Sequence, residues 1–218
     1  MDHDGIEYVS PDADLVQELR RRVLDSEQGT VGLKLLPFVD EPGITYNYRV
    51  RFEDGTGEVI REETIPVFVD AGQRDAQQAL GERVVEGETV SAKPDATNLR
   101  TVMDAEDDLR AAADRYVSVR VNEIKSNLRS KRHEETAREL ENLNEYAQAE
   151  RERIESFIEE YERKSEAGSD MDIAIRGQRE RLEKLEERIE TRRRELKRRE
   201  QVISLAPEVE NYCLTLPL

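Results

Sequence analysis

A strict seven-residue repeat of aliphatic residues near the C-terminus constrains this 218-residue chain more than any other feature. The repeat consists of Ile175, Leu182, Ile189, Leu196 and Ile203, with Leu185 at a second position of the same seam. A mean spacing of 3.5 residues keeps one apolar seam facing a neighbouring helix, which is typical of a coiled coil. A single unpaired charged helix would not require the repeat. The sequence therefore predicts that this segment is one arm of a helical pair.

The other arm is expected directly upstream, because residues 101–167 contain neither Gly nor Pro. Apolar residues recur there at alternating steps of three and four, interrupted by Glu150: Leu140, Leu143, Ala147, Ile154, Phe157 and Tyr161. A short break at residues 165–170 separates the two apolar patterns. A connection this short places consecutive helices side by side and antiparallel. We therefore predict an αα-hairpin with arms of about 30 residues, or roughly 45 Å each.

The first hundred residues differ in composition from the rest of the chain and contain most of the Gly and Pro residues. Residues 44–52 alternate between apolar and polar side chains, which is typical of a half-buried strand. Residues 30–39 and 58–69 are expected to form strands on either side of it, joined through short turn sequences. We also expect a short strand at residues 6–10, followed by a helix that begins near Asp12. Three strands in this order would form an antiparallel meander.

An apolar alternation at residues 212–216 ends the chain, and we expect this segment to return to the sheet. The predicted fold class is therefore α+β, with a long antiparallel helical hairpin inserted before a C-terminal strand. Residues 1–100 and 205–218 would form the antiparallel sheet domain, and residues 101–204 the helices and coiled coil.

Several kinds of chemistry are excluded by residue counts and missing motifs. One Cys and two His cannot form a disulfide framework or a Cys/His zinc site within one chain. The sequence contains no phosphate-binding loop, nucleophile elbow or H-E-x-x-H motif. Acidic residues are so frequent that pairs of them do not single out a magnesium site. We therefore expect no catalytic residues, no metal, no cofactor and no enzymatic activity, with a metal-dependent hydrolase as a remote alternative.

The overall charge is strongly negative, with 50 acids against 34 bases and a formal net charge of −16. Acids are spread along the whole chain, and among the bases 27 are Arg and only 7 are Lys. This composition indicates adaptation to a cytoplasm of high salt, where a short Debye length limits self-repulsion. No apolar run is long enough to span a membrane. We expect a soluble cytoplasmic protein without a membrane partner.

One segment is basic against this acidic background. Residues 176–199 contain eleven bases and six acids, whereas residues 134–164 on the other arm contain five bases and eleven acids. The basic segment could contact a nucleic-acid backbone or an acidic partner. Equally, the two arms could neutralise each other through ion pairs that flank the seam. The candidate contact residues are Arg181, Arg188, Arg192, Arg193, Arg194, Lys197, Arg198 and Arg199.

The beginning of the chain carries a family resemblance in the segment Ile6-Glu7-Tyr8-Val9-Ser10-Pro11-Asp12-Ala13-Asp14-Leu15-Val16. It resembles the opening of the C-terminal domain of the RapA (HepA) family, the RNA-polymerase-associated ATPases of the Swi/Snf helicase superfamily. Members commonly have an aromatic, an aliphatic, Thr or Ser, two variable residues, His-Pro and then Leu-Val. Ala13 and Asp14 stand here in place of His-Pro. The order of a meander, charged helices with a hairpin and a terminal apolar strand agrees with the family across the chain.

The resemblance implies an accessory domain rather than a motor, because the motor motifs of such ATPases are missing from this chain. Such a domain would regulate or position a helicase-like motor, present in the same polypeptide or in another chain. It would act on transcription complexes, RNA polymerase or nucleic acid. The alternative from the residues alone is a coiled-coil scaffold or oligomerisation module, such as a homodimer, without a role in transcription.

Overall fold

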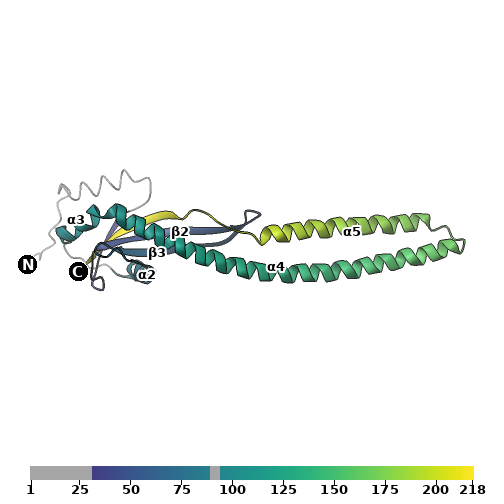
Figure 1. Cartoon of the computed structure of the whole chain (residues 1–218), viewed down its shortest axis with the longest axis horizontal. Coiled ribbons are helices and arrows are strands. Elements are labelled where there is room, and N and C mark those ends of the chain that lie inside the picture. The colour runs from purple at the N-terminus through teal and green to yellow at the C-terminus, as the bar shows by residue number, and fades with distance from the viewer. Residues whose placement is uncertain (1–30, 89–93) are drawn as a thin grey trace, which may run out of the picture. The chain divides into compact units, whose positions relative to one another are not determined.

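The computed structural model describes residues 31–88 and 94–218 (Figure 1). The predicted first strand, the first helix and the RapA-like segment all lie outside these residues. Contacts divide the described chain into two compact units. The sheet unit contains residues 31–51, 61–88, 94–123 and 204–218, and the hairpin unit contains residues 52–60 and 124–203. The first part of the long helix thus belongs to the sheet unit, and the β2–β3 turn belongs to the hairpin unit.

Six strands form one sheet in the order β1-β6-β2-β3-β4, and β5 pairs with β2. Their bounds are β1 Val31–Leu36, β2 Gly43–Asp54, β3 Val59–Asp70, β4 Ala76–Gln77, β5 Val202–Ser204 and β6 Glu208–Pro217. The α+β class and the return of the C-terminal strand to the sheet are confirmed. In Figure 1 the yellow C-terminal strand lies beside β2.

The arrangement of β1 and β2 corrects the predicted antiparallel meander. These strands are not neighbours, because β6 lies between them, antiparallel to β2 and parallel to β1. The sheet is therefore mixed. The fully buried Thr215 of β6 shares a hydrogen bond with Thr45 of β2, with 3.1 Å between their hydroxyl oxygens. The last residues of the chain are thus central to the sheet.

The alternation predicted for β2 is confirmed, since Tyr46 and Tyr48 are buried while Arg49 is exposed. The Tyr48 hydroxyl donates a 2.6 Å hydrogen bond to Asp114 Oδ1, and Asp114 also pairs with Arg110 at 3.1 Å. Both partners lie on α4 (Glu106–Glu166), whose first part packs on this face. Burial is the main cause that raises the pKa of both tyrosines above the ordinary value.

Two shorter helices complete the sheet unit. The helix α2 (Gln78–Glu86) contributes Val84 to a core with Leu36 and Phe68. Gly81 allows α2 to approach β3 closely, because a Cβ at this position would lie 2.5 Å from a backbone carbonyl oxygen. The helix α3 (Ala96–Asp104) begins after Asp95, whose carboxylate accepts hydrogen bonds from the first backbone amides of the helix.

The hairpin unit contains the remainder of α4 and the antiparallel α5 (Asp172–Arg199) (Figure 1). The predicted αα-hairpin is confirmed, with its turn where the break was expected. Gly168 ends α4 with a φ of +94°, a conformation that side chains disfavour. The Ser169 amide donates to the Lys164 carbonyl oxygen at 3.0 Å, which completes a common glycine-dependent helix end.

Candidate functional site

The seam between α4 and α5 is filled by side chains of one chain. Ala147 and Ile154 of α4 form a buried core with Leu185 and Ile189 of α5. Leu196 is also buried. The other predicted seam residues on the helices are half-buried: Leu140, Leu143, Phe157, Tyr161, Ile175 and Leu182. Thr136 and Ile158 also lie on the buried side of α4 and were not predicted.

Ile203 is not part of this seam, which corrects the prediction from the repeat. It lies in β5, beyond the end of α5 at Arg199, and its exposed fraction is 46%. The fifth member of the repeat falls at the right spacing in the sequence, but the chain has already left the helical conformation. The spacing alone does not report the end of the helix, because no Gly or Pro separates Leu196 from Ile203.

Glu150 occupies the point where the apolar pattern of α4 is interrupted. Its side chain is 24% exposed and lies 3.7 Å from Arg181 of α5 and 3.5 Å from Arg153 of its own helix. A polar residue at a seam position favours one register of a helical pair at some cost in stability. We interpret Glu150 as a residue that helps to fix how the two arms align.

Ion pairs connect the arms along most of the basic segment. Arg179 pairs with Glu162 at 2.9 Å, and Arg192 lies 3.5 Å from Glu139. A reciprocal pair joins Arg151 of α4 to Glu186 of α5 at 3.5 Å. These contacts match the charge-neutralising interpretation of the two arms. Surface pairs of this kind contribute only about 0–1 kcal/mol each.

The eight candidate contact residues fall into three groups. Carboxylates lie within ion-pair distance of Arg181, Arg192, Arg194 and Arg199. Neutral oxygens accept hydrogen bonds from Arg193 and Arg198. Within residues 31–88 and 94–218, Arg188 and Lys197 have no ion-pair or hydrogen-bond partner. Three cations near the C-terminal end of α5 therefore lack a carboxylate partner in the described chain: Arg193, Lys197 and Arg198.

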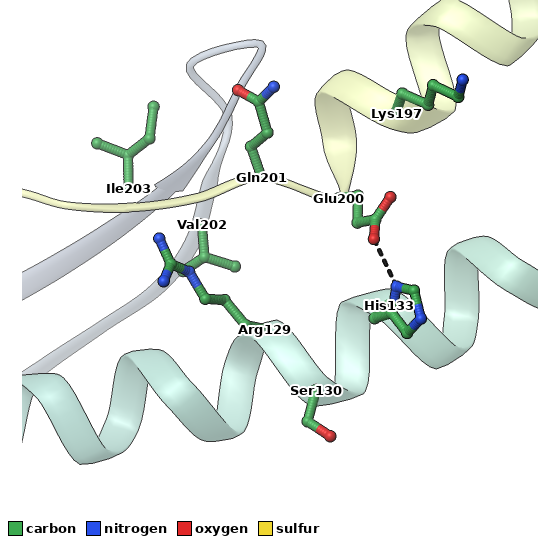
Figure 2. A pocket seen from close by; sticks show the side chains of 8 residues that line it. All are labelled: Arg129, Ser130, His133, Lys197, Glu200, Gln201, Val202 and Ile203. Atoms are coloured by element: carbon green, nitrogen blue, oxygen red, sulfur yellow. Dashed lines mark hydrogen bonds and ion pairs between the residues drawn. The ribbon is translucent and has the colours of Figure 1, made fainter.

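An open groove of about 840 Å³ lies at this end of the hairpin, which we call its base. Its lining, shown in Figure 2, comes from α4, from the end of α5 and from the segment that follows α5: Arg129, Ser130, His133, Lys197, Glu200, Gln201, Val202 and Ile203. His133 Nδ1 lies 2.6 Å from Glu200 Oε1, which links the two walls. Arg129 has no carboxylate within ion-pair distance in the described chain.

The β2–β3 turn is attached to the same end of α5. The Gly55 amide donates to the Arg198 carbonyl oxygen at 3.0 Å, and the Arg198 guanidinium donates back to the Gly55 carbonyl oxygen at 3.2 Å. Asp54 holds the turn, because its Oδ1 accepts bonds from the amide and hydroxyl of Thr56 and from the amide of Glu58. Burial alone would raise the pKa of Asp54, but these hydrogen bonds lower it overall.

The α4 side of the groove was missed at the level of sequence, although a signal was present. Residues 125–133 contain four bases and no acid in a chain where acids dominate. The charge of this arm was compared over residues 134–164, and the basic residues 125–133 lie before that range.

Other kinds of site receive no support in the part of the chain that the structure describes. No group of three or more His, Cys, Asp or Glu side chains there could hold a metal ion. Cys213 is half-buried in β6, and burial raises its pKa, which disfavours the reactive thiolate. No described helix is long and apolar enough to cross a membrane. Comparison with protein-family models, curated proteins and solved structures finds no match to this chain.

Proposed function

We propose that this chain is a non-catalytic accessory module of a RapA-like Swi/Snf ATPase and that its helical hairpin carries the contact surface. The observation that supports this most is the position of β6 between β1 and β2. Because the last strand completes the sheet, the hairpin is an insertion within one sheet domain. A helical hairpin between the first strands and a returning terminal strand is also what the RapA resemblance implies, although the antiparallel meander of β1, β2 and β3 that belongs to that layout is replaced by a mixed sheet. The motor would be in the same polypeptide or in a separate chain.

The distribution of charge also favours a contact function over a purely structural one. Ion pairs join the two arms at several positions, but Arg129 and Lys197 at the base are left without carboxylate partners in the described chain. Cations that a fold leaves uncompensated in an acidic protein are available to a partner. The partner would be RNA polymerase, the motor or nucleic acid, in a cytoplasm of high salt.

The alternative, a scaffold that oligomerises through its coiled coil, fits this geometry less well. The apolar seam is already filled within one chain by residues such as Ile154 and Leu185. A second copy could use the seam only if the hairpin opened. Light scattering should therefore give the mass of one chain, 25.2 kDa. A stable oligomer that dissociates on substitution of Ile154 would favour the scaffold.

Affinity capture of the tagged chain from an extract of its own cells, at their internal salt concentration, tests the proposal. We expect mass spectrometry to identify a Swi/Snf-type motor or RNA polymerase subunits above the background of a control. The matched control is the double variant Ile154→Asp and Leu185→Asp, which places two charges in the seam and should open the hairpin. Capture of neither partner, or equal capture by the opened variant, would contradict a contact function of the hairpin.

A further inference from the structure

We infer that the base of the hairpin binds the sugar-phosphate backbone of a nucleic acid through Arg129, Arg193, Lys197 and Arg198. We call these four residues the basal basic cluster. All four lie in the hairpin unit, one on α4 and three near the end of α5. The inference deepens the proposed function, on which it rests, by naming the chemistry of the partner.

The first argument is the pairing of charges along the hairpin. Some basic residues farther from the base, such as Arg179 and Arg181, pair with carboxylates of the opposite arm, whereas Arg188 has no partner within residues 31–88 and 94–218. The cluster residues do not: Arg193 donates to the neutral Asn144 amide oxygen at 2.6 Å, and Arg198 donates to a backbone carbonyl oxygen. Their positive charge therefore stays available to an anion.

The carboxylates around the cluster do not cancel this charge. Glu200 is bonded to His133, and Glu195 lies between Arg192 and Arg199. The β2–β3 turn, residues 52–60, contributes three acids. Against them, residues 125–133 carry a net charge of +4 and residues 193–203 a net charge of +3, if histidine is neutral. These three segments together carry a net charge of +4 in a chain of net charge −16.

The second argument is the shape of the site. Arg129 and Lys197 line one open groove and belong to different elements, so cations flank it on both sides (Figure 2). Ile203 also lines the groove, with an exposed fraction of 46%. A strand of nucleic acid presents phosphates at regular intervals together with apolar sugar surfaces. Guanidinium groups bind phosphate oxygens in a planar two-bond geometry, which suits a cluster in which three of four cations are Arg.

An acidic protein segment is the competing partner. It would present carboxylates on flexible side chains, with no need for a continuous open groove. The exposed apolar side chain of Ile203 in the same open groove favours the sugar surfaces of a nucleic acid, and the acidic peptide becomes an outcome of the test.

The test measures how the affinity of the full-length chain for a fluorescent 20-base-pair duplex, followed by anisotropy, depends on KCl concentration. Each phosphate contact contributes about −0.9 to the slope of log K against log salt for duplex DNA, so four contacts predict a slope of about −3.6. A single strand of the same length is a parallel probe, with a slope of about −0.7 per contact. Circular dichroism defines the salt range over which the chain stays folded.

The deciding comparison uses two double variants with the same change in net charge. Arg129→Gln with Lys197→Gln removes two cations of the cluster, and Arg179→Gln with Arg181→Gln removes two paired cations elsewhere on α5. We expect the first variant to reduce the magnitude of the slope by about 1.8. The ratio of the original chain's affinity to the variant's affinity should therefore be about 60-fold larger at 0.1 M salt than at 1 M salt. The second should bind like the original chain.

Three results would overturn the inference: no binding of either probe by the original chain, equal losses in the two variants, or binding of a polyglutamate peptide in place of nucleic acid. Failure here is distinguishable from failure of the accessory function. If only the nucleic-acid inference fails, the cluster variant would still capture a motor or polymerase from the extract. If the accessory function fails, neither the original chain nor the cluster variant would capture one, whatever their affinity for nucleic acid.

Discussion

Replacement of Ile154 by Ala tests whether the seam holds the hairpin together. The Ile154 side chain is 1% exposed and packs in the core shared by the two arms. The change removes three carbons, worth about 2.4 kcal/mol at 0.8 kcal/mol per buried methylene. The cavity left behind adds to this loss, and buried Ile→Ala changes generally cost about 2–5 kcal/mol. We therefore expect a loss of about 3 kcal/mol in the free energy of unfolding of the hairpin.

The matched control is Ile173→Ala, since Ile173 lies at the start of α5, the other arm of the same hairpin, and is 74% exposed. Its cost should stay within about 0.5 kcal/mol, as for other surface substitutions. Urea unfolding at constant high KCl, followed by circular dichroism at 222 nm, measures both. With a slope of about 2 kcal/mol/M, Ile154→Ala should lower the midpoint by about 1.5 M. Equal midpoints for the two variants would refute an intramolecular seam at this position.

Three further predictions concern the turn, a close helix contact and a partly buried hydrogen bond. Asp54→Ala should lower the free energy of unfolding by about 1–2 kcal/mol, because it leaves turn amides unpaired. Since hydrogen bonds lower the pKa of Asp54 in the folded chain, the stability difference between the original chain and the variant should be full above pH ~4 and should shrink as the pH falls through the folded-state pKa. Thermal unfolding of both chains between pH 7 and 3 measures this difference. Gly81→Ala should destabilise by about 1–3 kcal/mol through overpacking, whereas Gly177→Ala, with open space around it on α5, should stabilise by about 0.5–1 kcal/mol. Tyr48→Phe should cost about 1.5–3 kcal/mol in chemical denaturation, because its hydroxyl bonds the Asp114 carboxylate, and an unchanged midpoint would contradict that bond.

The hairpin could be predicted from sequence because its cause is local. A seven-residue repeat such as Ile175, Leu182 and Ile189 acts through helix periodicity, and a short break sets the antiparallel direction. The end of α5 could not be placed in this way, because Ile203 continues the spacing after the helix has ended.

Local sequence patterns could not predict the mixed sheet. Pairing of β1 with β6 joins residues such as Leu33 and Leu214, which are far apart in the sequence. Alternation identifies a strand but does not choose its neighbour, so consecutive strands were predicted to pair. The buried hydrogen bond between Thr45 and Thr215 is one of the contacts that accompany the actual order.

The candidate site was predictable only in part, for a related reason. Counting charges located the basic segment of α5, but only the antiparallel register shows which bases meet carboxylates. Arg181 and Arg192 are paired, while Lys197 is not. Arg129 was missed because its neighbourhood is assembled from two elements that the sequence separates by about 70 residues.

Photochemical cross-linking with a nucleic acid that carries a photoreactive base tests the central claim most directly. After irradiation of the full-length chain and proteolysis, mass spectrometry identifies the modified peptides. If the cations at the base of the hairpin form the contact surface, adducts should concentrate in residues 125–133 and 193–203. Adducts spread along residues 176–192, or confined to the sheet unit, would contradict this account.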